Sequence, residues 1–164
     1  MYYETKSMLH KQGFERYEIS NYAKPGYECR HNIGYWTGIE YLGLGLGASS
    51  YIQGFRFHNE SDLSLYDKIQ MNGTDADEKL HQEITRLSDK EKMEEFMFLG
   101  LRMIKGVSGS EFFQRFGQNM WNVYGNVLNK LKDEGLIIVD MPDVRLSDYG
   151  IDVSNYVLSE FLLD

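Results

Sequence analysis

The sequence predicts an α+β fold in two parts of different kind. The chain has 164 residues, of which 42% are apolar and 14% aromatic, enough for a packed core. Residues 1–60 combine short apolar runs with glycines and contain six acidic and six basic side chains. The whole net charge of −8 therefore falls in residues 61–164, where apolar residues recur at helical spacing. A polar stretch separates the two patterns, and we place the domain boundary there, giving parts 1–72 and 73–164.

The first part begins with a helix and continues with strands. Residues 2–12 have a helical pattern that ends at Gly13, and Phe14–Ser20 then reads as a strand before the turn at Pro25. A helix with no strand before it indicates an alternating α/β domain that lacks its beginning.

Glycine and leucine alternate in the segment YLGLGLGAS, residues 41–49. On an extended strand this alternation puts the glycines on one face and the leucines on the other. The spacing of Gly43, Gly45 and Ala48 also fits a dinucleotide-binding fingerprint, but that motif requires a helix directly after the glycines, and the next residues look extended. We therefore predict a strand whose glycine face lies against a helix or a flat ligand.

The second part has a helical pattern followed by a hairpin. Ser88 and Glu91 form a capping box for a helix, and each expected helix ends at a glycine. The expected elements are helices at 88–104, 112–116 and 120–134, strands at 136–139 and 144–146, and a helical segment at 151–163. Helix, helix and hairpin form a winged-helix order, so DNA binding is an alternative function.

Charge argues against that alternative. The expected recognition helix carries asparagines and two lysines, but Asp133 and Glu134 follow directly, and phosphate contacts need clustered Lys and Arg. We expect no nucleic-acid partner.

Composition also bears on the compartment. Cys29 is the single cysteine, so the chain cannot form an internal disulfide, and it contains eight methionines. The longest uncharged run, residues 41–55, is rich in glycine and shorter than the ~20 apolar residues of a membrane span. We expect a cytoplasmic protein without membrane insertion.

The stretch CRHNIGYW, residues 29–36, contains the candidate ligand site. His31 and Tyr35 are four residues apart and share one face of a helical turn, and an imidazole beside flat aromatic surfaces suits axial ligation of a haem iron. Arg30 could meet a haem propionate, and Cys29 is a soft ligand by chemistry. A hydrogen-bonded core histidine and an inert thiol are the competing interpretation.

Several segments carry a resemblance to a known family. YEISNYAKPGYECRHNIGYW and YLGLGLGAS resemble the late part of the catalytic barrel in the radical SAM family of oxygen-independent coproporphyrinogen III oxidases and their relatives. EKMEEFMFLGLRMIKGVS, NKLKDEGLI and VRLSDYGIDVSNYVLSEFL resemble the C-terminal domain of that family. The resemblance implies the terminal strands and helices of a partial (β/α) barrel in residues 1–72 and a mainly helical, winged-helix-like domain in residues 73–164.

The haem-chaperone branch of this family has an HNxxYW element, which His31, Asn32, Tyr35 and Trp36 match. The resemblance implies that these four residues bind haem, with His31 as the ligand of the iron. It also implies that the protein delivers haem to apo-proteins such as respiratory cytochromes. Ala23 matches a family position that lies against S-adenosylmethionine.

The resemblance further implies a 4Fe-4S cluster and S-adenosylmethionine in the intact protein. That family binds its cluster through a CxxxCxxC motif, and one thiol cannot anchor four irons. We therefore expect the chain to be the C-terminal portion of a longer protein and inactive alone as a radical enzyme. Two alternatives stay open: a portion of an oxygen-independent coproporphyrinogen III oxidase of porphyrin biosynthesis, and a non-enzymatic interaction module. The open edge of a partial barrel would also allow a homodimer.

Overall fold

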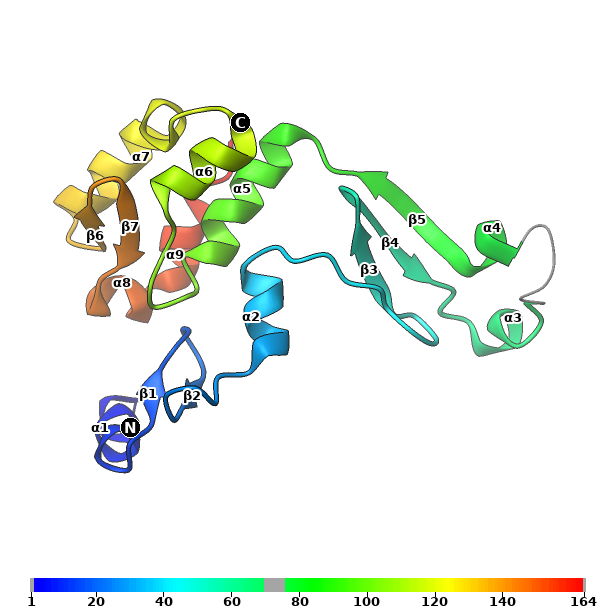
Figure 1. Cartoon of the computed structure of the whole chain (residues 1–164), viewed down its shortest axis with the longest axis horizontal. Helices are drawn as coiled ribbons and strands as arrows, with labels where there is room; N and C mark the ends of the chain where they lie inside the picture. Colours follow the sequence, from blue (N-terminus) through cyan, green and yellow to red (C-terminus); the bar gives the residue numbers. More distant parts are fainter. Residues whose placement is uncertain (1, 70–75, 164) are drawn as a thin grey trace. The chain divides into compact units, whose positions relative to one another are not determined.

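A computed structural model of the chain describes residues 2–69 and 76–163, which form two compact units (Figure 1). The first, here called the core unit, joins Met1–Gly38 to Asp89–Asp164. The second, here called the sheet unit, comprises Ile39–Ser88. The boundary expected between residues 72 and 73 lies outside the described residues, so the division into parts 1–72 and 73–164 stays a prediction.

The core unit begins with short elements. These are α1 (Tyr2–Lys11), β1 (Glu15–Arg16), β2 (Tyr22–Ala23) and α2 (Arg30–Trp36). The helix expected over residues 2–12 is confirmed, and Gly13 ends it with a φ of 79°, which favours glycine. The strand expected over residues 14–20 is wrong in extent, because β1 has only two residues and pairs antiparallel with β2.

The rest of the predicted strand pairs elsewhere. The Ile19 amide donates to the Arg102 carbonyl at 3.0 Å, and the Ile104 amide donates to the Tyr17 carbonyl at 3.1 Å. Residues 17–19 are thereby attached to the segment after α5, a long-range pairing that leaves no mark in the local sequence.

The second stretch of the core unit is mainly helical. It contains α5 (Asp89–Gly100), α6 (Gly109–Phe116), α7 (Met120–Asp133), β6 (Ile137–Asp140), β7 (Asp143–Leu146), α8 (Asp148–Asp152) and α9 (Ser154–Ser159). The hairpin and the helices expected at 112–116 and 120–134 are confirmed, whereas the helix expected over 88–104 ends at Gly100 because residues 102–104 pair with residues 17–19. The final segment is two short helices instead of one, because Val153, with φ −112° and ψ 29°, interrupts the helix. The first of them starts earlier than expected, where the Ser147 hydroxyl accepts from the Gly150 amide at 2.9 Å.

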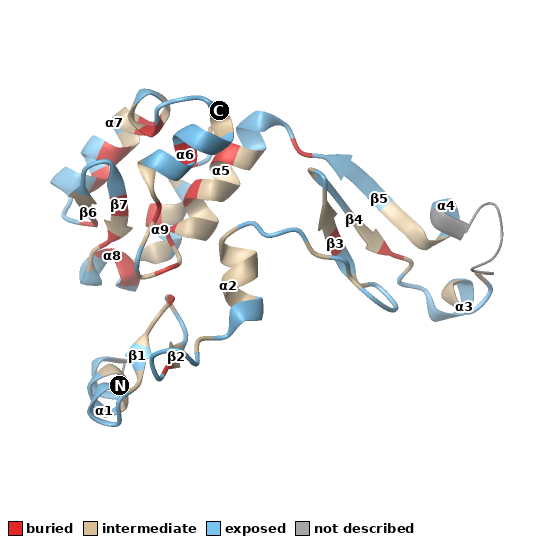
Figure 2. Cartoon of the chain, in the orientation of Figure 1, coloured by how far each residue is buried: buried red, intermediate tan, exposed pale blue. Residues whose placement is uncertain are grey.

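Apolar side chains from these helices and the hairpin form one hydrophobic core. Ring contacts join Phe112 to Tyr124 and Tyr124 to Phe161, with centroids 6.1 and 5.5 Å apart. Figure 2 shows the buried positions gathered on α5 to α9. The fully or almost fully buried members include Met97, Leu101, Phe112, Met120, Tyr124, Leu128, Leu131, Val144, Val157 and Phe161.

The sheet unit is built on one antiparallel sheet of order β3-β4-β5. Its elements are β3 (Ser49–Ile52), β4 (Phe55–Asn59), α3 (Leu63–Tyr66), α4 (Ala76–Leu80) and β5 (His81–Arg86). The extended stretch expected from residue 48 onward is confirmed by β3 and β4. Among the helices of the described residues, none is long and apolar enough to cross a membrane.

The glycine and leucine segment before β3 is a loop, so the predicted strand is wrong there. Gly45 and Gly47 have φ angles of 96° and 64°, which favour glycine, and a Cβ on Gly43 would lie 2.3 Å from the Ser49 carbonyl oxygen. The Asn59 side-chain amide donates to the Gly45 carbonyl at 2.8 Å. Backbone geometry, and not a flat glycine face, explains why glycine recurs at these positions.

Candidate functional site

The predicted haem residues lie on α2 or next to it. His31 is exposed, whereas Asn32, Tyr35 and Trp36 are half-buried. The His31 and Tyr35 rings meet edge to face, with centroids 4.8 Å apart and an interplanar angle of 81°. The expectation that these two side chains share one helical face is confirmed, and the exposure of His31 contradicts the competing interpretation of a core histidine.

Trp36, at the end of α2, contacts a different set of side chains. The Arg102 guanidinium lies over the Trp36 ring, 4.2 Å from its centroid. The same guanidinium approaches the Glu18 carboxylate at 3.7 Å, and the Glu18 side chain is completely buried. The other Glu18 oxygen accepts from the Ser20 amide at 2.8 Å. Trp36 is therefore fixed beside a buried acid and its arginine partner.

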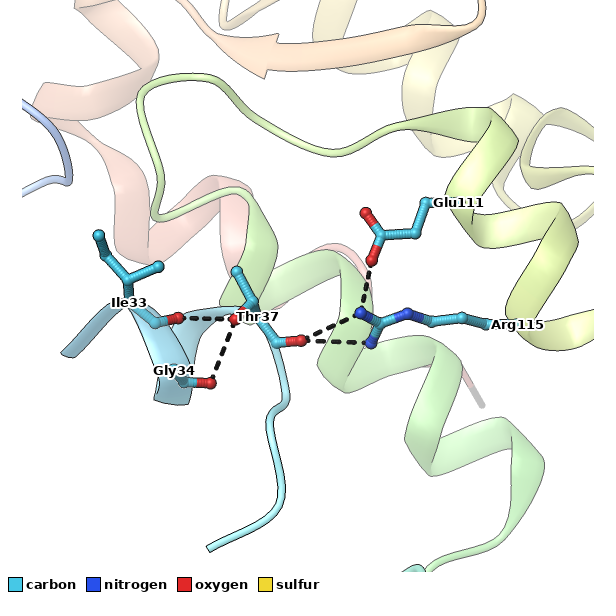
Figure 3. A network of polar contacts seen from close by, with 5 residues as sticks. All are labelled: Ile33, Gly34, Thr37, Glu111 and Arg115. Carbon is cyan, nitrogen blue, oxygen red and sulfur yellow. Dashed lines mark hydrogen bonds and ion pairs between the residues drawn. The ribbon is translucent and has the colours of Figure 1, made fainter. Parts of the chain in front are cut away.

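Arg115 of α6 holds the residue that follows α2 (Figure 3). Both Arg115 Nη atoms donate to the Thr37 carbonyl, each at 3.2 Å, and the same guanidinium forms an ion pair with Glu111. The Thr37 hydroxyl in turn donates to the Ile33 carbonyl at 2.8 Å. The C-terminal end of α2 is thus tied to α6.

The remaining predicted residues lie at the start of α2 and in β2. Arg30 is the exposed first residue of α2, and the exposed Cys29 precedes it with a free thiol. Ala23, the predicted S-adenosylmethionine contact, is buried in β2 opposite Glu15. These positions leave Arg30 accessible to a solvent-borne ligand and make Ala23 a part of the protein interior.

A bare metal ion and a haem iron need different numbers of protein ligands. Within residues 2–69 and 76–163, no group of three or more His, Cys, Asp or Glu side chains could hold a bare metal ion. A haem iron is already held by four porphyrin nitrogens and needs only an axial ligand from the protein. The accessible His31 imidazole can supply that ligand, with the Tyr35 ring in edge-to-face contact beside it.

Sequence reasoning missed Glu18, Arg102 and Arg115. Arg102 lies 66 positions from Trp36, and Arg115 lies 78 positions from Thr37, so no local spacing links either arginine to α2. Glu18 stands in a run that reads as a strand, which gives no sign that its carboxylate is buried.

Comparisons with known proteins agree on one family. The HemN C-terminal domain model matches residues 87–153. The Heme chaperone HemW of Lactococcus lactis is 35% identical over 164 residues, which is 100% of this chain and 42% of that protein. The Heme chaperone HemW of Bacillus subtilis is 36% identical over 163 residues, again 42% of that protein. The chain therefore spans less than half the length of these relatives.

A solved structure gives the same fold at lower identity. The coproporphyrinogen III oxidase (HemN) from Escherichia coli, a radical SAM enzyme, matches with a TM-score of 0.75 and 16% identity, over 98% of this chain and 40% of that one. At this identity the likeness establishes the α+β fold alone. Residues 87–153 thus match the HemN C-terminal domain model, and the chain as a whole is homologous to part of the HemW heme chaperones.

Proposed function

We propose that this chain is a portion of a haem chaperone and that α2 binds haem, with His31 as the axial ligand of the iron. The observation that carries the proposal is the exposed His31 imidazole, held against Tyr35 at 4.8 Å in a chain homologous to heme chaperones. In the longer protein, haem bound here is cargo that passes to an apo-protein such as a respiratory cytochrome.

Each residue of the element has a distinct role in this proposal. The His31 imidazole binds the iron, Tyr35 offers an aromatic edge beside it, and Arg30 pairs with a propionate at the rim of the porphyrin. Trp36, stacked on Arg102, gives α2 a fixed end from which the first turn projects. Asn32 follows His31 and offers an amide to the ligand.

Haem titration with a matched histidine control tests the proposal. Adding haem to the chain should give a Soret band that is weakened and shifted in His31→Ala. His10 is the matched control, because it too is exposed, lies in the same unit and is bonded to Glu15 at 2.9 Å, remote in sequence from α2. Identical spectra and affinities for wild type, His31→Ala and His10→Ala would remove His31 from the site.

An oxidase portion is the second candidate, supported by the likeness to the coproporphyrinogen III oxidase fold. Reductive cleavage of S-adenosylmethionine requires an iron-sulfur cluster, and Cys29 supplies only one thiolate, so these residues do not fit the cluster. The two candidates differ in what His31 recognises. If His31→Ala weakens binding of haem but not of an iron-free porphyrin, the iron-binding role stands. Equal loss for both ligands would favour a porphyrin substrate site.

We also infer the finer architecture. The order α5, α6, α7 and the β6–β7 hairpin supports a winged-helix-like domain, as does the backbone pairing of Val107 with Val144. The resemblance of residues 1–72 to the end of a radical SAM barrel supports a partial barrel there. β5 pairs only with β4 in the described sheet, and its other edge would serve a homodimer. The lone cysteine supports a cytoplasmic location.

A further inference from the structure

We propose that Arg102 and Arg115 are positioning residues for haem binding, which hold α2 in the conformation that presents His31. Both arginines lie in the region matched by the HemN C-terminal domain family, residues 87–153. The proposal rests on the haem site proposed above. It gives the C-terminal domain a specific task, namely to support the haem-binding helix of the preceding segment.

The helix itself has little intrinsic stability. α2 has seven residues, contains glycine at position 34, has no buried residue, and its N-cap side chain makes no capping hydrogen bond. Isolated helices shorter than ~12–15 residues are marginal in water, so α2 depends on contacts from outside its own sequence. Helix α2 lies against α5, and its specific polar and ring contacts include those from Arg102 and Arg115.

Arg102 is itself fixed from two further sides. Its guanidinium lies between the Trp36 ring at 4.2 Å and the buried Glu18 carboxylate at 3.7 Å. Its backbone carbonyl accepts from the Ile19 amide at 3.0 Å. Moving the arginine away would leave the buried Glu18 carboxylate without its ion-pair partner, which is costly, so Arg102 offers a fixed surface on which Trp36 stacks.

Arg115 binds the backbone at the C-terminal end of α2. Backbone carbonyls at a helix C-terminus carry partial negative charge and have no partner within the helix. The two N–H···O bonds to Thr37 satisfy such a carbonyl, and the ion pair with Glu111 orients the guanidinium toward it (Figure 3). Arg102 thus holds α2 through the Trp36 side chain, and Arg115 holds it through the Thr37 backbone carbonyl.

The consequence concerns the geometry of His31 and Tyr35. Arg102 contacts Trp36 and Arg115 contacts Thr37, one turn or more after the proposed iron ligand. Loosening that end frays a helix of two turns, and the edge-to-face contact of His31 with Tyr35 depends on the helix being formed. Haem affinity should therefore fall although neither arginine is proposed to contact haem.

The test uses variants that keep the fold. Arg102→Lys keeps a positive charge beside Glu18 but loses the planar group that stacks on Trp36, and Arg115→Gln removes the two-pronged bond to Thr37. Each variant should weaken haem binding about tenfold. A tenfold change corresponds to ~1.4 kcal/mol of binding free energy, which is the size expected for a cation–π contact or a charged hydrogen bond. Arg115→Lys, which retains one charged donor, should recover part of that loss. Lys132→Gln is the control, because it removes one positive charge from an exposed position on α7.

A second measurement needs no haem. Amide exchange at Thr37 and Gly38, whose N–H groups bond to the Ile33 and Tyr35 carbonyls, should become about tenfold faster in both arginine variants and stay unchanged in Lys132→Gln. The denaturation midpoint of Arg115→Gln should match that of the wild type, which separates positioning from general destabilisation.

The outcomes distinguish the two proposals. If His31→Ala loses affinity and both arginine variants keep wild-type affinity and exchange, the positioning role is wrong while the haem site stands. If His31→Ala binds haem like the wild type, the haem site is wrong, and with it the proposed purpose of the arginines. Faster exchange at α2 together with weaker haem binding, partly restored in Arg115→Lys, supports the positioning role.

Discussion

The core unit and the sheet unit differ in what they bury. The core unit encloses a continuous set of apolar side chains, of which Phe112, Leu128 and Phe161 are completely buried. Among its described residues, the sheet unit buries one apolar residue, Leu87, and two polar residues, Ser50 and Asn59, while its other apolar side chains are half-buried or exposed (Figure 2). Those exposed apolar residues are Ile39, Leu42, Leu44, Leu46, Phe55, Leu63, Leu65 and Ile84.

This difference teaches how each unit is held together. Burial of apolar surface is the main source of stability in the core unit, and its removal leaves cavities that cost free energy. The sheet unit depends on strand pairing and on hydrogen bonds to a glycine loop, interactions whose net contribution is small because water competes for them. We therefore expect the core unit to unfold as one body and the sheet unit to open locally.

The largest expected effect comes from truncating one buried leucine. Leu128→Ala should lower the free energy of unfolding by about 2–5 kcal/mol, because the side chain is completely buried in the core. Leu44→Ala is the matched control at 84% exposure and should change stability by less than about 0.5 kcal/mol. Urea unfolding measures both. Equal losses would mean that Leu44 is buried in solution and that the contrast between the units is wrong.

Amide exchange should show the same contrast without any mutation. Amides of β3 and β4 should exchange at least about a hundredfold faster than those at 124–131 of α7, since a small sheet with few fully buried apolar side chains is marginal. A hundredfold corresponds to ~2.7 kcal/mol. The measurement belongs at several protein concentrations, because dimerisation through β5 would slow exchange. Equal protection in a dilute monomer would show that the sheet unit is as stable as the core.

A smaller effect should follow from the side chain that holds the glycine loop. Asn59 donates to the Gly45 carbonyl at 2.8 Å and to the Gly43 carbonyl at 3.3 Å, so Asn59→Ala leaves these groups to water or unpaired. The loss should be about 1–3 kcal/mol and confined to the sheet unit. Amide exchange at 41–59 should accelerate, while the unfolding midpoint of the core unit stays constant. Asn122→Ala, at an exposed position on α7, is the control and should change neither the amide exchange at 41–59 nor the stability of the sheet unit.

The sequence predicted the elements of the core unit better than those of the sheet unit. The reason is that the core unit is held by apolar burial, which leaves a pattern in the sequence, whereas the sheet unit depends on strand pairing and loop hydrogen bonds. Helices that bury one face repeat their apolar residues every three to four positions, so the helices of residues 89–133 were visible. The segment of residues 41–48 alternates like a strand, but its glycines serve positive φ angles and a close approach at Gly43. Positive φ angles and a close backbone approach both require glycine, and here they put it at every second position, as one face of a strand would.

The candidate site was predictable only in part. The spacing of His31 and Tyr35 gave their shared face, because that contact lies within one helix. The support from Glu18, Arg102 and Arg115 depends on residues brought together by the fold. No sequence period or motif indicates such a contact, so the positioning residues could be identified only from the structure.

The smallest expected effect is at the surface of the core unit, where α1 is joined to α8 by polar contacts. Lys6 donates to the Asp148 carboxylate at 2.9 Å, and this hydrogen bond, with the attraction of the charges, lowers the pKa of Asp148 below its ordinary value of 3.8. A lowered folded-state pKa stabilises the protein above the unfolded value, and that contribution is lost as pH falls below about 3.8 toward the folded-state pKa.

Both side chains are exposed, so the pair should contribute only about 0.2–1 kcal/mol at pH 7. Lys6→Met should remove that amount at pH 7 and a smaller amount at about pH 3, where the unfolded-state carboxyl, with its ordinary pKa of 3.8, is already largely protonated. Lys11→Met, at an exposed position in the last turn of α1, is the control and should leave the pH dependence unchanged. Urea midpoints at the two pH values measure the difference. A loss of several kcal/mol in Lys6→Met would show that α1 is held as firmly as the buried core, and that surface contacts in this unit contribute as much as apolar burial.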